Sequence, residues 1–385
     1  MEQPRETGLG DDGPGDIKRK YLAEAGLILY SDAPVMFRPS DIYRLGKDPG
    51  FREVLRGSNI YLICRRHRVS IDPLSLEVKG GDLYGDFLVH GEGYQEWEPV
   101  SFTLTPAQLG RTSPPIPFVA VRADSAAGHG IVLAEQTGHT VEMSCAVLAT
   151  QSKHKLGDNT KLEVLYVGQT FGAKGDRLAV DRLSRHTTLQ RILADVADQC
   201  GRDEVLLLGL TYGRAKNMLS SAGNRWVEPS ATSEEEHAHW KKTGGQTFTR
   251  KDRILLAEAA LINYFKPHYN LQHLDSFSTK ERRRKLKTLQ SLFREDFSAL
   301  MVEISTSAIG AKLWSAAAPR SRGEMLFTAS KVAEMRANSL KADPPMPSSE
   351  FDEFIRDHVM VHIAQYALYD PTERETFLHG LHWGE

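Results

Sequence analysis

The stretch Leu256-Ala-Glu-Ala-Ala-Leu-Ile-Asn-Tyr-Phe-Lys-Pro-His-Tyr-Asn270 decides how the middle of this 385-residue chain is interpreted. At about 100° per residue, a helix over Asp252 to Phe265 gathers four apolar residues on one stripe: Ile254, Leu261, Ile262 and Phe265. Glu258 lies at the centre of that stripe, and Pro267 ends the helix. Burying an unpaired charge is expensive, so this carboxylate needs a partner.

A second helix with the same peculiarity is predicted over Leu178 to Asp198. Its apolar stripe consists of Leu178, Leu189, Leu193 and Val196. Arg182 lies at the centre of the stripe, and His186 lies beside it. A cation and an acid that both face the core side either form a structural ion pair or border a cleft that holds a charged ligand. The residues alone favour neither alternative.

The elements around these helices follow a simple order. A strand is predicted over Leu162 to Gly168, and a loop over Phe171 to Asp176 leads into the first helix. A buried strand follows over Glu204 to Leu210, and residues 211–250 are polar and irregular. The pattern therefore predicts strand, loop, helix, strand and helix, with a large insertion before the last helix.

Three segments in this order resemble the GIY-YIG nuclease superfamily over about residues 160–272. Tyr166-Val-Gly168 is similar to the second half of the signature, and Gln169-Thr170 continues it. Arg182-Leu-Ser-Arg-His186 resembles the R-x-x-x-H segment of the phage homing-endonuclease branch. The stretch from Leu256 to Asn270 resembles the closing motif. The resemblance implies an α+β fold with a small central sheet flanked by helices.

The resemblance also implies a role for each of these residues. Glu258 would bind Mg²⁺ or Mn²⁺ and Arg182 the scissile phosphate, while Tyr166 and His186 would orient or activate water. Asn270 would fix the wall of the site. Each of three residues also has a purely structural alternative: Tyr166 as a core tyrosine, His186 as a core histidine and Asn270 as a helix cap. A GIY-like strand is expected about ten residues before Tyr166, but the best strand there, Cys145 to Ala149, has no tyrosine. The general base therefore stays open.

The charge distribution favours a polyanionic partner for the central segment. Residues 151–300 carry a net charge of +7, whereas residues 1–150 carry -5 and residues 301–385 carry -4. Four cations are expected to bind nucleic acid: Lys174 and Arg177 before the first helix, and Arg283 and Arg284 in the basic stretch Thr279 to Arg294. For the last two, a solvated helix face is an equal alternative.

The flanking segments predict further units. Residues 1–15 read as a disordered tail, and residues 16–150 as a β-rich domain that begins with a helix over Asp16 to Leu29. The nuclease-like domain would occupy residues 151–275, with its insertion near 211–250. Residues 276–385 would form an α+β unit, with a strand over Met325 to Ala329 and a final helix over Phe351 to Tyr369.

Composition and motifs together lead to a functional hypothesis. No apolar run could span a membrane, no signal peptide is visible, and the three cysteines lie far apart, which predicts a cytoplasmic protein. We expect a metal-dependent endonuclease that cuts nucleic acid, most readily DNA. By analogy it would serve bacterial restriction or defence, as a homodimer or with a partner protein. The alternative is a catalytically decayed module that binds nucleic acid or supports assembly.

Overall fold

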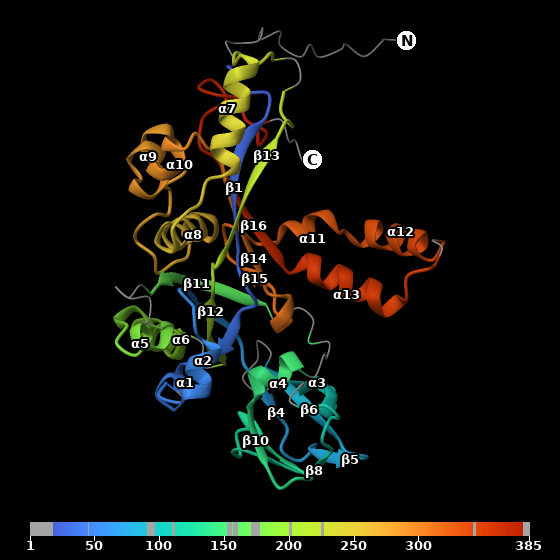
Figure 1. Ribbon diagram of the computed structural model, residues 1–385. Coiled ribbons are helices and arrows are strands. Elements are labelled where there is room, and N and C mark those ends of the chain that lie inside the picture. The colour runs from blue at the N-terminus through green and yellow to red at the C-terminus, as the bar shows by residue number, and fades with distance from the viewer. Residues whose placement is uncertain are drawn as a thin grey trace, which may run out of the picture.

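The structure, a computed structural model, is a mixed α+β protein built from several sheets with helices around them (Figure 1). It describes residues 18–44, 46–90, 97–109, 112–151, 156, 161–170, 178–199, 202–224, 227–341 and 344–379. The expected tail, residues 1–15, lies outside these ranges. Among the helices that the structure describes, none is long and apolar enough to cross a membrane.

A five-stranded sheet lies at the centre of the molecule. Its order is β15 (Leu313–Trp314), β11 (Leu162–Gln169), β3 (Ile60–His67), β12 (Asp203–Leu210) and β2 (Val35–Phe37). β3 pairs antiparallel with both β11 and β12. Its first five residues are fully buried, as expected for a strand covered on both faces.

Helices cover both faces of this central sheet. On one face, Tyr61 and Ile63 pack in a core with residues of α5 (Ala179–Leu183) and α6 (Thr187–Gln199). The short helices α1 (Pro39–Arg44) and α2 (Pro49–Val54) lie near the same side (Figure 1). On the other face, Ile60 and Leu62 pack in a core with α8 (Arg250–Phe265). The predicted helix over Asp252 to Phe265 is thus present, and its apolar stripe is buried.

A small β-rich module is inserted between the neighbouring strands β3 and β11. One of its sheets contains β4 (Val69–Ile71), β5 (Glu77–Lys79), β6 (Asp82–His90) and β7 (Trp97–Leu104). The other contains β8 (Phe118–Ala123), β9 (Gly130–Glu135) and β10 (Thr140–Ser144). Two helices complete it, α3 (Pro106–Leu109) and α4 (Cys145–Gln151). Cys145 to Ala149, read as a strand from the sequence, is therefore helical.

A second mixed sheet joins distant parts of the chain. Its order is β13 (Arg214–Ser220), β1 (Glu24–Tyr30), β14 (Ala299–Ser305) and β16 (Val361–Ala367). The predicted helix over Asp16 to Leu29 is wrong, because residues from Glu24 onward form β1. Residues 211–250 are ordered in large part as β13 and α7 (Ser233–Gly244). Since β1 pairs with both β13 and β14, the expected boundaries at 150 and 275 do not separate independent sheets.

The C-terminal part adds helices to this frame. They are α9 (Lys280–Lys285), η2 (Lys287–Leu289), α10 (Gln290–Arg294), η3 (Ser307–Ile309), α11 (Arg322–Leu326), α12 (Ala329–Ser339) and α13 (Ser348–Val359). The last three project to one side of the molecule (Figure 1). The expected strand over Met325 to Ala329 is wrong, because this segment is the end of α11, a short connection and the start of α12. The expected helix over Phe351 to Tyr369 ends at Val359, and the chain continues as β16.

Candidate functional site

The structure places a tyrosine beside Tyr166 that the sequence pattern did not reveal. Tyr61 is the second residue of β3 and lies opposite Gly168 of β11. The ring centroids of Tyr61 and Tyr166 are 6.2 Å apart. Ile60 to Cys64 is a short apolar run typical of a strand, but it lies about 100 residues before Tyr166 in the sequence. The β-rich module separates these two segments in the sequence. Tyr61 and Tyr166 therefore become neighbours only through the pairing of β3 with β11 in the sheet.

Gly168 leaves the space in which the two tyrosine rings meet. A Cβ at this position would lie 2.6 Å from both the hydroxyl oxygen and Cζ of Tyr61, and 2.7 Å from Cε1 of Tyr166. Backbone atoms of a sheet strand move little, so any larger residue would displace one of the rings. The glycine is therefore required by the close approach of these tyrosines.

The cation of the site lies on the short helix α5, and the histidine lies in the connection between α5 and α6. The predicted continuous helix over Leu178 to Asp198 is broken between α5 and α6. Arg182 is consequently exposed overall and does not point into a core, although its Nε donates to the Tyr61 hydroxyl at 3.1 Å. His186 lies at the break, where its Nδ1 accepts the backbone N–H of Leu189 at 3.2 Å.

The hydrogen bonds of His186 fix its neutral tautomer. Because Nδ1 accepts from a backbone N–H, the ring proton of a neutral imidazole must sit on Nε2. Nε2 lies 3.2 Å from the Tyr61 hydroxyl and therefore donates to it. The Tyr61 oxygen thus accepts from both Arg182 and His186, so its own proton is directed elsewhere. The ring of Tyr166 lies 5.1 Å from that of His186 and completes the cluster.

Burial keeps the three rings in their neutral forms. It raises the pKa of the Tyr61 phenol well above its usual value, and the donors on its oxygen only partly oppose the shift. Burial also raises the pKa of Tyr166, against the opposing effect of Arg182. The pKa of His186 is lowered by burial and then by the nearby charge of Arg182. At neutral pH these residues are hydrogen-bond donors and positioning groups.

Glu258 of α8 is the acid of the site, and none of the described cations forms a direct ion pair with it. Burial raises its pKa to about 7, although Arg182 and a backbone hydrogen bond from Gln169 both lower it. Among the residues that the structure describes, no Lys, Arg or His forms an ion pair with this carboxylate within 4.0 Å. Because the negative charge of the buried Glu258 carboxylate is only partly compensated, an additional positive charge beside it would stabilise it.

A divalent cation fits this arrangement. The side-chain oxygen Oε1 of Gln169, whose backbone contacts Glu258, is buried and has no hydrogen-bond partner among the described residues. Carboxylate and amide oxygens are the ligands that Mg²⁺ uses, and Mg²⁺ commonly retains several waters beside one or two protein ligands. The described residues contain no group of three or more His, Cys, Asp or Glu that could bind a metal ion.

Asn270 fixes the strand that carries Tyr166. Its Oδ1 accepts the N–H of Val167 and its Nδ2 donates to the carbonyl of Val167, both at 2.9 Å. The asparagine is buried, and it thereby satisfies two backbone groups on the edge of the site. The predicted role of a wall-fixing residue agrees with these contacts.

The four residues expected to contact nucleic acid do not lie in similar environments. Lys174 and Arg177 lie outside the described residues. Arg283 is buried, where it forms an ion pair with Asp370 and donates to backbone carbonyls, so its predicted role as a surface contact is wrong. Arg284 is partly exposed, but its guanidinium lies 4.1 Å from the Phe293 ring centroid and near Glu373.

No protein-family model, curated protein or solved structure matches this chain.

Proposed function

We propose that this protein is a metal-dependent endonuclease that hydrolyses a phosphodiester of nucleic acid, with DNA as the favoured substrate. One observation carries the proposal: Tyr61, Tyr166, Arg182, His186 and Glu258 converge at one end of β3 and β11. Four of these residues come from β3, β11, α5 and α8, and His186 comes from the connection between α5 and α6. A structural role for the charges would predict a direct ion pair between Arg182 and Glu258, and no such pair is found among the described residues.

The proposed roles follow from the hydrogen bonds. Glu258 would hold the divalent ion, which would neutralise charge on the phosphate and help the leaving oxygen. Arg182 uses Nε to hold Tyr61, which leaves its exposed terminal amino groups for a phosphate. His186 acts through Tyr61 and is a positioning residue. Tyr166, protonated at neutral pH, would donate to a phosphate oxygen or orient the attacking water, whereas Tyr61, whose side chain is fully buried, would hold Arg182 and His186 in position.

Tyr61 also supplies what the family resemblance lacked. Ile60-Tyr61 on β3 resembles the GIY half of the signature, and it pairs in the sheet with the strand that carries Tyr166-Val-Gly168. Asn59 stands where that signature has glycine. We infer that the nuclease-like unit is assembled from residues 60–67 and about 160–272, with the β-rich module inserted between its first two strands.

Cleavage assays test the proposal. The wild-type chain should nick or cut supercoiled plasmid DNA with Mg²⁺ or Mn²⁺ and not with EDTA. Glu258→Gln and Arg182→Ala should each lose about a hundredfold to a thousandfold in rate. Glu163→Gln is the matched control, since Glu163 lies on β11 but pairs with Arg65 and not with the site.

Two outcomes would contradict the proposal. The first is the absence of cleavage of duplex, single-stranded and branched DNA and of RNA with either metal ion. Salt-sensitive binding that Glu258→Gln leaves unchanged would then favour the alternative of a catalytically decayed nucleic-acid-binding module. The second is cleavage that survives Glu258→Gln at the wild-type rate, which would indicate a contaminating nuclease.

A further inference from the structure

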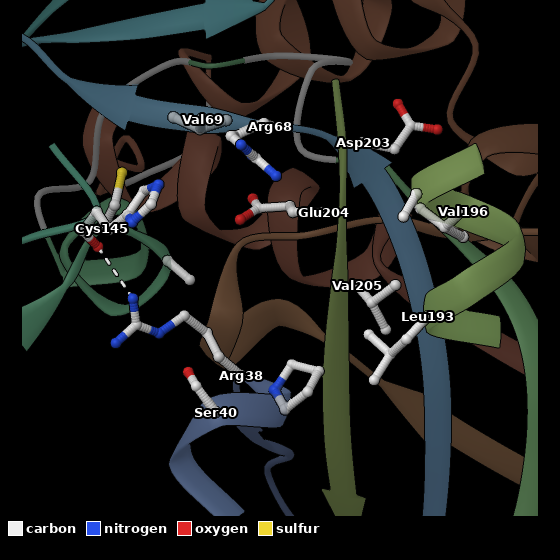
Figure 2. Close-up of a pocket in the computed structure, with 14 residues that line it drawn as sticks. Arg38, Ser40, Arg68, Val69, Cys145, Leu193, Val196, Asp203, Glu204 and Val205 are labelled. Atoms are coloured by element: carbon white, nitrogen blue, oxygen red, sulfur yellow. Dashed lines mark hydrogen bonds between the residues drawn. The ribbon is translucent and has the colours of Figure 1, made fainter. Parts of the chain in front are cut away.

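A second pocket lies at the opposite end of β3 from Tyr61. It has a volume of about 390 Å³ and is enclosed by α1, α6, the start of β12 and the β-rich module (Figure 2). Arg68, directly after β3, is seven residues from Tyr61, which corresponds to roughly 23 Å along an extended strand. The pocket is therefore separate from the candidate active site, and its volume is that of a small-ligand site.

One positive charge in this pocket is not neutralised. Three of the four Asp, Glu and Arg side chains that line it have partners: Asp203 contacts His67 at 2.9 Å, Glu204 contacts Arg66 at 2.7 Å, and Arg38 contacts Asp41 at 3.5 Å. The guanidinium of Arg68 has no acidic partner within 4.0 Å among the described residues. It is only partly exposed, so water compensates its charge incompletely.

Many of the other residues that line the pocket are apolar, beside the polar Ser40 and His129. Val69 of the β-rich module, Val205 of β12 and two residues of α6, Leu193 and Val196, line it. Leu193 is 37% exposed, although the other apolar residues of its helix stripe are buried. Figure 2 shows Arg68 and Glu204 on one side of the cavity, with Leu193, Val196 and Val205 on another. A ligand that covered Leu193 would complete the apolar stripe of α6.

We propose that this pocket binds a nucleotide. Its phosphate would pair with Arg68, which offers the planar donor fork that suits phosphate oxygens. Its base would lie between the apolar walls, where the remaining carboxylate capacity of Glu204 and the Ser40 hydroxyl can bond amino and keto groups. The nucleotide is either free in solution or part of a nucleic-acid strand held by the protein. The inference does not depend on the proposed nuclease activity.

Calorimetric titration of the full chain in EDTA tests the free source. The titrants are the four 5′-deoxynucleoside monophosphates, the corresponding nucleosides and inorganic phosphate. At least one monophosphate should bind, at least tenfold more tightly than its nucleoside or phosphate alone. Arg68→Gln should weaken this binding at least tenfold, whereas Arg122→Gln, an exposed arginine on β8 outside the pocket, should leave it unchanged.

A fluorescence titration tests the strand-bound source. A short single-stranded oligonucleotide that contains 2-aminopurine should become more fluorescent when its base leaves the stack and enters the pocket. Arg68→Gln should abolish this increase. If Arg68→Gln does not fold, Leu193→Glu replaces it, because Leu193 is exposed at the pocket and a carboxylate there would repel the ligand. The proposal is overturned if no monophosphate or oligonucleotide signal depends on these residues, or if inorganic phosphate binds as tightly as the nucleotides.

Discussion

Two groups of charged residues in this molecule differ in whether their buried charges are paired. At the end of the second sheet, Arg374 is buried and contacts both oxygens of Glu24, at 2.9 and 2.5 Å, and Asp296 at 2.5 Å. At the end of the central sheet, Glu258 has no directly paired cation among the described residues, and Arg182 bonds to a tyrosine. The charges of the first group are balanced within the protein, whereas Glu258 in the second group has no such balance among the described residues.

The pKa shifts of the two groups show the same contrast. Burial raises the pKa of the Asp296 carboxyl, but Arg374, Lys20 and Tyr21 outweigh burial and lower it overall. For Glu258, burial outweighs its weak partners, so the pKa rises to about 7. A buried charge with its own partners is explained by the structure alone, whereas a buried charge without sufficient compensation marks a candidate functional residue.

The largest effect on stability is expected when Arg374 is removed from its ion pairs with Glu24 and Asp296. Arg374→Met should destabilise the protein by about 3 to 5 kcal/mol, because Glu24 would remain buried without its cation. Arg182→Met, at an exposed position, should cost less than about 1 kcal/mol. Urea unfolding of both variants measures the difference. Equal destabilisation by the two substitutions would contradict the distinction drawn between the groups.

In the second group, by contrast, we expect Glu258→Gln to increase the stability of the protein, whereas Arg374→Met decreases it. The folded-state pKa of about 7 lies above the usual value of 4.5, so the folded protein binds the proton more tightly, and wild-type stability falls as pH rises from 4.5 to 7. Without metal, Glu258→Gln should therefore be more stable than wild type by on the order of 3 kcal/mol above pH 8. At pH 4 the two should be equally stable.

Mg²⁺ provides the control for this prediction. At pH 8 it should raise the unfolding temperature of the wild type and leave that of Glu258→Gln unchanged, because a ligand that binds only the folded state stabilises it. A stabilisation by Glu258→Gln that is the same at pH 4 and pH 8 would show that burial does not raise the pKa of this carboxyl.

A smaller loss is expected at the strand that carries Tyr166. Asn270→Ala should cost about 2 to 3 kcal/mol, since the buried N–H and carbonyl of Val167 would lose their side-chain partner. Asn263→Ala on α8, a partly buried residue whose Nδ2 donates to the carbonyl of Leu274, is the matched control and should cost less. Cleavage should fall in Asn270→Ala more than in Asn263→Ala. A wild-type rate in Asn270→Ala would remove this residue from the site.

The smallest effect is expected for the tyrosine hydroxyl. Tyr61→Phe removes the oxygen that Arg182 and His186 share, so these donors lose their fixed positions. The cleavage rate should fall about tenfold to a hundredfold, with a change in stability of about 1 kcal/mol. Tyr30→Phe, on β1 away from the site, is the control. An unchanged rate in Tyr61→Phe would leave this hydroxyl with a structural role only.

Helix patterns predicted the candidate site better than they predicted the fold. The apolar stripe of α8 with Glu258 at its centre was readable because helical periodicity is a local property. The same reasoning failed for Arg182, because the chain breaks the helix at His186 and turns the arginine outward. The helix predicted near the N-terminus was wrong because β1 is held by strands far along the sequence, whose pairing outweighs local propensity.

The sequence by itself determined the strand with Tyr166, the helix with Glu258 and the spacing of Arg182 and His186. Only the tertiary structure decided that Tyr61 joins them. Sheet neighbours are chosen by hydrogen bonding between strands, and a long inserted segment adds little to the free-energy cost of closing the loop. The β-rich module could therefore separate β3 from β11 in sequence without separating them in space. The pocket beside Arg68 has the same origin, because its lining residues come from α1, β4, α4, α6 and β12, which no local sequence pattern connects.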